Sequence, residues 1–237
     1  GVVAWCVAVL PPVAATALLG LLLQQAGFVF AAVFNVAVLY LTLGFRQFSH
    51  YFTAIQLAVK SGDIDRARAE LDAWRGVSGV VRSREEVIRL SIEEALLASH
   101  RNVFGVLLWY VVLGPAGAVL YRLAAYFAVR WKGLALFGEF AQRAFYLLEL
   151  PAVRITAAAF AIVGDFEDAV YCWRTQARSW QEPNAGVILS AGAGAMGVRL
   201  GMPVQEIDGV HPRPEVGLSE PADAPFLDST VGLLWRA

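Results

Sequence analysis

Two long runs without a charged side chain open the sequence. Val2–Leu23 and Ala26–Phe45 contain no Asp, Glu, Lys or Arg, and about 20 apolar residues are enough to cross the hydrocarbon core of a bilayer. The polar pair Gln24 and Gln25 separates the runs and predicts the turn between them. We therefore expect residues 1–45 to form an antiparallel transmembrane hairpin with a truncated start.

The composition of the whole chain agrees with a membrane protein. Hydrophobic residues make up 58% of the chain and charged residues 16%, whereas about 25% of the residues of a soluble domain are charged. The net charge of −1 and the lack of a basic stripe argue against nucleic-acid binding. Cys6 and Cys172 have no His or Cys at a zinc-like spacing, so we expect two ordinary buried thiols and no metal site.

A charged segment follows the hairpin. Residues 46–101 carry 9 Lys or Arg and 8 Asp or Glu. Asp63 and Ser83 stand where helix caps are expected, and Ser83 opens a capping box with Glu86. We expect residues 46–102 to form a solvent-facing helical module, on the cytoplasmic side because its basic residues flank the hairpin.

Apolar segments return after this module, over residues 103–201. Val103–Leu120 is broken by Gly114 and Pro115, so a full membrane span and a kinked re-entrant helix both fit. Asp165 is expected to cap another helix. Residues 202–237 predict a proline-rich loop that leads into a truncated final helix.

A glycine motif near the C-terminus is compatible with two kinds of structure. Gly192–Gly197 has the pattern G-x-G-x-x-G of dinucleotide-binding turns, but such a turn needs a strand before it and a long helix after it. No alternation of strands and helices surrounds this one, so we expect a tightly packed segment of small residues. The predicted fold class is all-α: a polytopic integral membrane protein with a charged helical module between its membrane segments.

Several motifs resemble those of one family. Pro183–Gly186 and Ala193–Gly201 are similar to the C-terminal signature of the CobD/CbiB cobalamin-biosynthesis family. Three upstream segments resemble the family in the same order: Gly62–Arg68, Gly117–Arg122 and Pro151–Ala157. The resemblance runs from about residue 45 to residue 201.

This resemblance implies a bacterial inner-membrane protein that handles a corrinoid. The family's synthases join aminopropanol, or its phosphate, to adenosylcobyric acid through an amide bond formed at the expense of ATP. ATP and magnesium are therefore the implied cofactors if synthase activity is retained. The implied partners are the lipid bilayer and a corrinoid substrate.

The sequence departs from the family at its acidic residues. In Ile92–Arg101 the family's first Glu is kept as Glu93, but its second Glu, its Asn and its Asp are replaced by Leu97, Ala98 and Arg101. Two further acidic motifs are replaced by Ala125–Ala128 and Arg143–Tyr146. These losses predict weak or absent catalysis. They are similar to those of AmpE, a membrane relative linked to β-lactamase induction, so an AmpE-like regulator is the alternative hypothesis.

The candidate site residues come mainly from these motifs. Glu93 is the catalytic candidate, with an equally good reading as one member of a surface ladder with Glu85 and Arg89. The ligand-binding candidates are Arg122, Arg143, Arg154, Asn184, Gly186, Gly194, Arg199 and Gly201. For Arg122 and Arg143 the alternative is anchoring at the membrane interface, and for Asn184 it is a turn residue. Arg154 interrupts an apolar run, which favours a ligand role.

Overall fold

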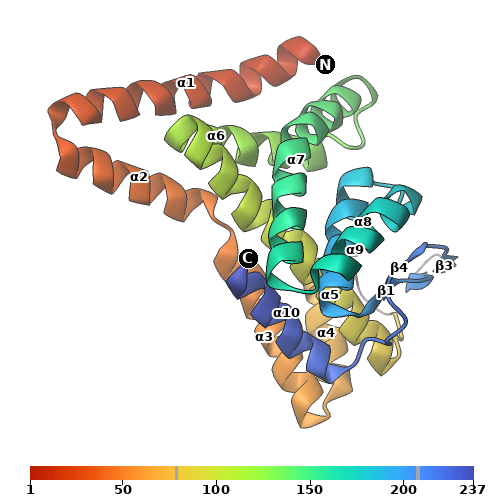
Figure 1. The fold of residues 1–237 in the computed structure, drawn as a ribbon. Coiled ribbons are helices and arrows are strands. Elements are labelled where there is room, and N and C mark those ends of the chain that lie inside the picture. The colour runs from red at the N-terminus through yellow and green to blue at the C-terminus, as the bar shows by residue number, and fades with distance from the viewer. Residues whose placement is uncertain (78–79, 207–208) are drawn as a thin grey trace. The chain divides into compact units, whose positions relative to one another are not determined.

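The computed structural model describes residues 1–77, 80–206 and 209–237, with the side chains of residues 45–48 and 135–136 set aside. The described chain is mostly helical and has short strands near its C-terminus (Figure 1). It divides into two compact units, each built from two separate stretches of the chain. Unit 1 comprises Gly1–Gly44 and Arg101–Ala152, and unit 2 comprises Phe45–His100 and Val153–Ala237.

Unit 1 begins with the expected hairpin. Its helices are α1 (Val2–Ala26), α2 (Phe28–Thr42), α6 (Gly105–Arg130) and the first part of α7 (Ala135–Val163). The chain reverses at Gly27, whose φ is 141°, and Figure 1 shows α1 and α2 running in opposite directions from this point. The prediction of a turn at Gln24 and Gln25 is therefore wrong, since both stay in α1 and only glycine adopts such a φ readily.

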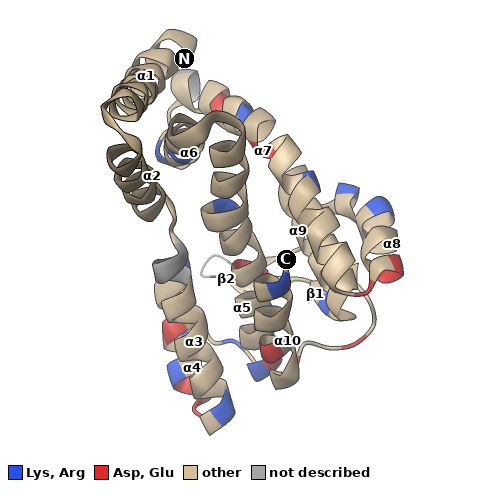
Figure 2. Cartoon of the chain, turned by 60° about the vertical axis from the view of Figure 1, so that its left-hand side comes forward, with Lys and Arg blue, Asp and Glu red and all other residues tan. Residues whose placement is uncertain are grey.

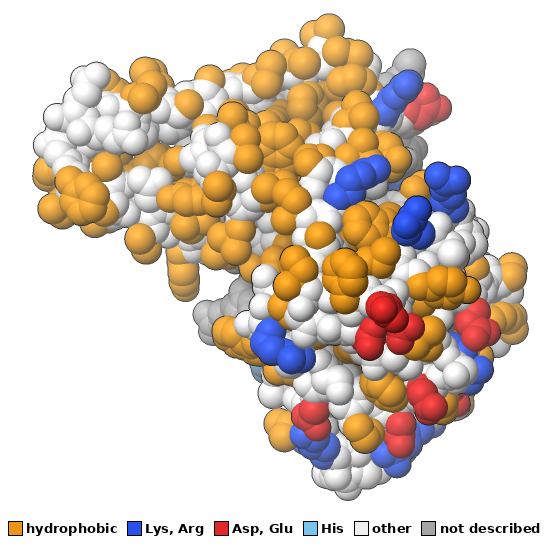
Figure 3. Space-filling view, in the orientation of Figure 1, with side chains coloured by type: hydrophobic (Ala, Val, Ile, Leu, Met, Phe, Trp, Pro, Cys, Tyr) orange, Lys and Arg blue, Asp and Glu red, His pale blue; other side chains and the backbone are white. Residues whose placement is uncertain are grey.

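The surface of α1 and α2 in unit 1 is apolar. Large hydrophobic side chains on α1 and α2 are exposed, among them Leu18 at 60% and Val29 at 69%. Figure 2 shows both helices without a charged side chain, and Figure 3 shows hydrophobic side chains spread over them. Three helical stretches are long and apolar enough to cross a membrane: Val2–Ala26, Arg84–Arg130 and Phe137–Val163. The all-α membrane class is confirmed.

The helix α6 is a hairpin in itself. At Gly114 the backbone leaves the helical region, with φ 66° and ψ −154°. A Cβ atom on Gly117 would lie 2.0 Å from the carbonyl oxygen of Trp109, although residues eight apart in a straight helix are about 12 Å apart along its axis. The Tyr121 ring likewise lies against Gly105. The break that Gly114 and Pro115 predict within Val103–Leu120 is therefore a full reversal of the chain.

Unit 2 is built around one buried helix. Its helices are α3 (Phe45–Ser61), α4 (Ile64–Arg75), α5 (Arg84–Ser99), α8 (Phe166–Gln176), the 3-10 turn η2 (Ala177–Ser179), α9 (Pro183–Met196) and α10 (Ala224–Arg236). The predicted caps are confirmed, because Asp63, Ser83 and Asp165 each accept a hydrogen bond from a backbone N–H three residues on. A π-helical turn, η1 (His100–Phe104), continues α5 into α6.

The helix α5 is buried rather than solvent-facing. Arg89 is 4% exposed and Glu93 is 3% exposed, so the predicted surface ladder with Glu85 is wrong. The reason is tertiary. The helix α5 is in contact with α3, α4, α9, α10 and strand β1. These elements cover charged side chains that the sequence pattern predicts to be exposed to water.

Short strands begin just before the region predicted as an extended loop, at residue 199, and continue through it. They are β1 (Arg199–Gly201), β2 (Val204–Glu206), β3 (Gly209–His211) and β4 (Glu215–Gly217). β1 pairs with β4 and β2 pairs with β3, both antiparallel. The loop prediction is wrong here because three-residue strands are too short to show alternation. Pro203, Pro212 and Pro214 stand between the strands, where no ladder donor is needed.

Candidate functional site

The family-like signature ends in a tight turn. After α9 the chain runs through β1 and turns at Gly201 and Met202, whose φ values are 78° and 68°. Met202 is the one residue other than glycine with a positive φ in the described chain, and such strain is found where surrounding contacts enforce it. A Cβ atom on Gly201 would lie 2.0 Å from the carbonyl oxygen of Pro214. We call Gly201–Pro203 the Gly201 turn.

Glu93 of α5 holds this turn from the core. Its Oε1 accepts a hydrogen bond from the backbone N–H of Gly201 at 2.9 Å. Its Oε2 lies 2.9 Å from Nη1 of Arg213, and Oε1 lies 3.7 Å from Nη1 of Arg89. The carboxylate is thus buried between one amide and two guanidinium groups, the setting in which a buried charge is tolerated.

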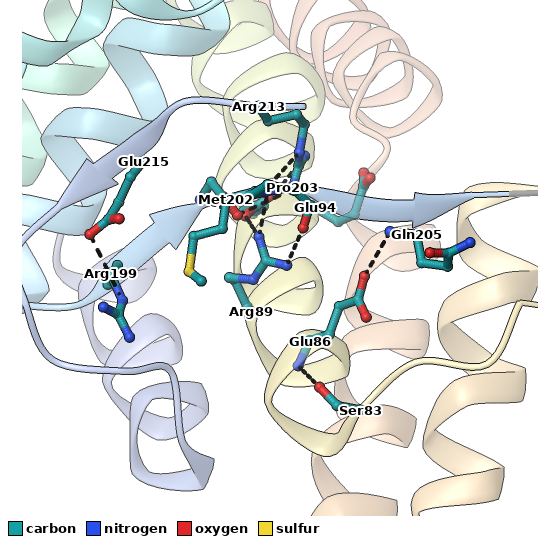
Figure 4. A network of polar contacts seen from close by, with 12 residues as sticks. Ser83, Glu86, Arg89, Glu94, Arg199, Met202, Pro203, Gln205, Arg213 and Glu215 are labelled. Carbon is teal, nitrogen blue, oxygen red and sulfur yellow. Dashed lines mark hydrogen bonds and ion pairs between the residues drawn. The ribbon is translucent and has the colours of Figure 1, made fainter. Parts of the chain in front are cut away.

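The two arginines complete the hold on the turn by donating to its carbonyls. Arg89 donates to the carbonyl oxygens of Met202 and Pro203, both at 3.3 Å, as Figure 4 shows. Arg213 donates to Met202 at 3.3 Å and lies over the Trp180 ring, 5.3 Å from its centroid. We call Arg89, Glu93 and Arg213 the clamp. Both the donors and the acceptors of the turn are therefore bound by α5 and by the segment before β4.

Further polar contacts tie β2 to the same helices. Oε1 of Glu86 accepts from the backbone N–H of Gln205 at 3.2 Å, drawn in Figure 4. In α4, the Nε atom of Arg75 lies 3.2 Å from Oε1 of Glu94, and its Nη2 atom lies 3.1 Å from Oε1 of Glu206. These contacts fix the strand that follows the Gly201 turn, so the turn is held on both sides.

The donor set around Glu93 suits a positioning role. Both carboxylate oxygens face groups that carry hydrogens or positive charge, and a cation such as Mg²⁺ needs free oxygen ligands. In the described residues there is no group of three or more His, Cys, Asp or Glu side chains that could hold a metal ion. In this conformation Glu93 orients the turn and is not placed to bind magnesium.

The candidate glycines of α9 have a packing role. A Cβ on Gly186 would lie 2.3 Å from the carbonyl oxygen of Ala177 in η2, and one on Gly194 would lie 2.4 Å from that of Asp168 in α8. On another face, a Cβ on Gly192 would meet the Leu96 side chain of α5 at 2.8 Å. The glycine motif is thus a helix that packs closely, as expected, and not a nucleotide-binding turn.

The other candidates are placed as follows. Asn184 is 6% exposed near the start of α9, whereas Arg154 is exposed on α7. Arg199 lies 3.9 Å from Glu215 across the β1–β4 pair. Arg143 is exposed in unit 1, where Arg122 is half-buried. Of these candidates, the structure brings Glu93 and Gly201 into direct contact. A ligand role for Arg154 and Asn184 stays a prediction.

Arg213 is the residue of this site that the sequence did not single out. It stands between Pro212 and Pro214, and the backbone of a residue that precedes a proline is restricted to extended conformations. That restriction is the available signal, because a residue whose backbone is already fixed loses less conformational entropy when its side chain pairs. Arg213 pairs with Glu93 and Trp180. Nothing in the sequence near Arg213 indicates that its partner is Glu93, which lies 120 residues away.

The fold and the clamp define the class of protein: a helical integral membrane protein whose buried carboxylate fixes a polar turn near its C-terminus. The family follows from comparison of the sequence. The chain belongs to the CobD/CbiB family, because the family described as CobD/Cbib protein matches residues 1–233.

Named relatives agree with this assignment. A protein of Stutzerimonas stutzeri called cobalamin biosynthesis protein CobD is 34% identical over 99% of this chain and 77% of its own length. One of the same name from Chromobacterium violaceum is 39% identical over 70% of this chain and 54% of its own length, so the chain spans about half of that relative. No solved structure matches the chain. The comparisons give no support to the AmpE-like hypothesis.

Proposed function

We propose that this protein binds a corrinoid intermediate of cobalamin biosynthesis at the bacterial inner membrane, with the Gly201 turn as part of the binding surface. One observation carries the proposal: Glu93, from one family-like motif, bonds directly to Gly201, from another, 108 residues along the chain. Motifs that are far apart in sequence but meet at one buried network form a single site rather than two independent packing features.

The chemistry of the turn suits such a ligand. A corrinoid is a large flat ring system that carries amide side chains, and its biosynthetic acids carry a carboxylate. The turn's own N–H and carbonyl groups are bound within the protein, so the turn offers a rigid surface that loses little conformational entropy when a ligand binds. Beside them, Arg213 stacks on Trp180 and provides a cation next to an aromatic face. A rigid surface beside a cation and an aromatic ring suits a flat and partly anionic molecule.

Catalysis is a separate matter from binding. ATP and magnesium are the cofactors of an amide-forming synthase of this family type, and they belong to this protein only if that activity is retained. The Glu93 donor set does not fit a cation, because its oxygens face Gly201 and two arginines. We therefore assign Glu93 a positioning role and derive no reaction step through either cofactor.

The test is titration of the detergent-solubilised protein with adenosylcobyric acid. Isothermal calorimetry is expected to show saturable heat, and Glu93→Gln is expected to weaken binding by about tenfold, since the turn loses one charged partner. The matched control is Glu85→Gln, because Glu85 is exposed on the same helix. A lack of heat together with an unchanged melting temperature in the unmodified protein would remove the proposal.

A further inference from the structure

Arg122 is a half-buried cation in the apolar unit 1. It lies on the second arm of the α6 hairpin, and its Nη1 donates to Oδ1 of Asn102 at 2.6 Å. Among the described residues it pairs with no carboxylate. A charged side chain in an apolar membrane segment is costly and usually faces a polar cavity or a partner, so its missing counter-charge needs an explanation.

The neighbouring ion pair does not supply that charge. Nε of Arg101 lies 3.4 Å from Oε1 of Glu149, whose side chain is only 6% exposed. The negative charge of Glu149 is thus already matched by Arg101. Since Asn102 is neutral, the group formed by Arg101, Asn102, Arg122 and Glu149 keeps one net positive charge.

Asn102 is held in place from two directions. It belongs to η1, the π-helical turn before α6, and such turns often mark functional positions in helices. The backbone carbonyl oxygen of Asn102 accepts a hydrogen bond from the backbone N–H of Gly44 at 3.3 Å. A Cβ atom on Gly44 would lie 3.0 Å from the side-chain Oδ1 of Asn102. The side chain is therefore wedged between the end of α2 and Arg122, and the two side chains are only half-buried.

The hydroxyl group of Tyr121, the residue before Arg122, also lacks a hydrogen-bond partner among the described residues. The Tyr121 side chain is fully buried. This hydroxyl lies against Gly105, the residue that follows η1. A buried polar atom without a protein partner commonly marks a bound water or ligand oxygen.

We propose that Arg122 and Asn102 form a binding site for a phosphate group, carried either by an acidic phospholipid or by a free phosphate compound. A guanidinium presents parallel N–H groups that match two phosphate oxygens. The Asn102 amide N–H, which has no partner in the described chain, adds a neutral donor. The site lies within unit 1 and does not depend on corrinoid binding by unit 2.

The experiment measures phosphate binding in two forms. Protein in a neutral detergent is titrated with inorganic phosphate and followed by thermal shift. In parallel it is mixed with phosphatidylglycerol or phosphatidylcholine, and lipid retention is read by native mass spectrometry. Arg122→Gln is expected to weaken binding at least about tenfold, because a hydrogen bond between charged groups is worth that much. Arg130→Gln is the control, since Arg130 is exposed at the end of the same helix.

A second variant separates binding from folding. Asn102→Asp places a carboxylate beside Arg122, which satisfies the cation internally and repels a phosphate. It is expected to abolish binding while the melting temperature stays the same or rises. A purely structural role for the Arg122–Asn102 contact predicts no change in binding for this variant.

Each outcome decides the matter. Loss of phosphatidylglycerol retention in both variants, without a response to inorganic phosphate, identifies the lipid headgroup as the source. A saturable phosphate response that both variants lose identifies a free phosphate compound. Binding of neither probe, or equal binding by the unmodified protein and both variants, overturns the proposal.

Discussion

At the scale of single residues, Glu93 shows how burial changes the role of a side chain. As part of a helical charge pattern it resembles a surface residue, but the structure places it at 3% exposure between Arg89, Arg213 and the Gly201 amide. A buried carboxylate in such a setting is costly to disturb, because its removal leaves two guanidinium groups without their counter-charge.

Replacing Glu93 with Ala should therefore destabilise unit 2. The expected loss is about 3–5 kcal/mol, the range for breaking a buried ion pair by removing one partner. Thermal unfolding in detergent measures it, with Glu85→Ala as the exposed control on the same helix, expected within about 0.5 kcal/mol of the unmodified protein. In a double-mutant cycle, Arg213→Gln should cost less in the Glu93→Ala background. Additive effects would show that the two residues do not interact.

At the scale of elements, α9 shows that glycines in one helix can do different things. Gly194 lies against the backbone of α8, whereas Gly192 lies against the flexible end of the Leu96 side chain. A side chain can move aside by changing rotamer, but a helix backbone moves only if the whole element shifts. The two positions therefore differ in their tolerance of a methyl group, although both read as small residues in the sequence.

The alkylation rate of Cys172 in α8 measures this difference between the two glycines. The residue is fully buried, and burial together with the nearby Asp168 raises the pKa of its thiol. Because the thiolate is the reactive form, alkylation near pH 8 should be slow and should rise as the pH increases. In a Cys6→Ala background, Gly194→Ala should accelerate alkylation of Cys172 by separating α8 from α9, and Gly192→Ala should do so much less. Equal rates in the two variants would contradict this account of the glycines.

At the scale of the whole molecule, each unit has its own surface and its own core. The helices α1 and α2 of unit 1 expose apolar side chains that a bilayer covers at low cost. Unit 2 instead buries α5 beneath the other helices and the strands. The chain passes between the units three times: once between α2 and α3, at Gly44, and twice within helices, along α5–η1–α6 and along α7.

The apolar surface of α1 gives a test of membrane insertion. Leu18→Asp should lower the amount of protein in the membrane fraction, because a charge near the middle of the bilayer costs about 2.5–3.5 kcal/mol. Leu57→Asp is the matched control: Leu57 is 63% exposed on α3 and Leu18 is 60% exposed, but α3 is outside the three candidate spans. Normal membrane yield of the Leu18 variant would show that α1 is not embedded.

Much of the fold could be predicted because its signals are local. A run without charges, such as Val2–Leu23, can only be buried in lipid or protein, and its length indicates lipid. The caps at Asp63, Ser83 and Asp165 were also predictable, since each side chain bonds to a backbone N–H three residues away. The family was recognised for a similar reason, because its motifs are short and occur in a fixed order.

What the sequence determined by itself was thus the helical class, the membrane hairpin, the caps and the family. Only the tertiary structure decided that α6 reverses at Gly114, that Glu93 is buried, and that Arg213 pairs with it across 120 positions of the chain. The physical reason is the range of the interactions. Hydrophobic runs and caps depend on neighbours within one or two helical turns, whereas burial and ion pairing depend on which distant segments the packed core brings together.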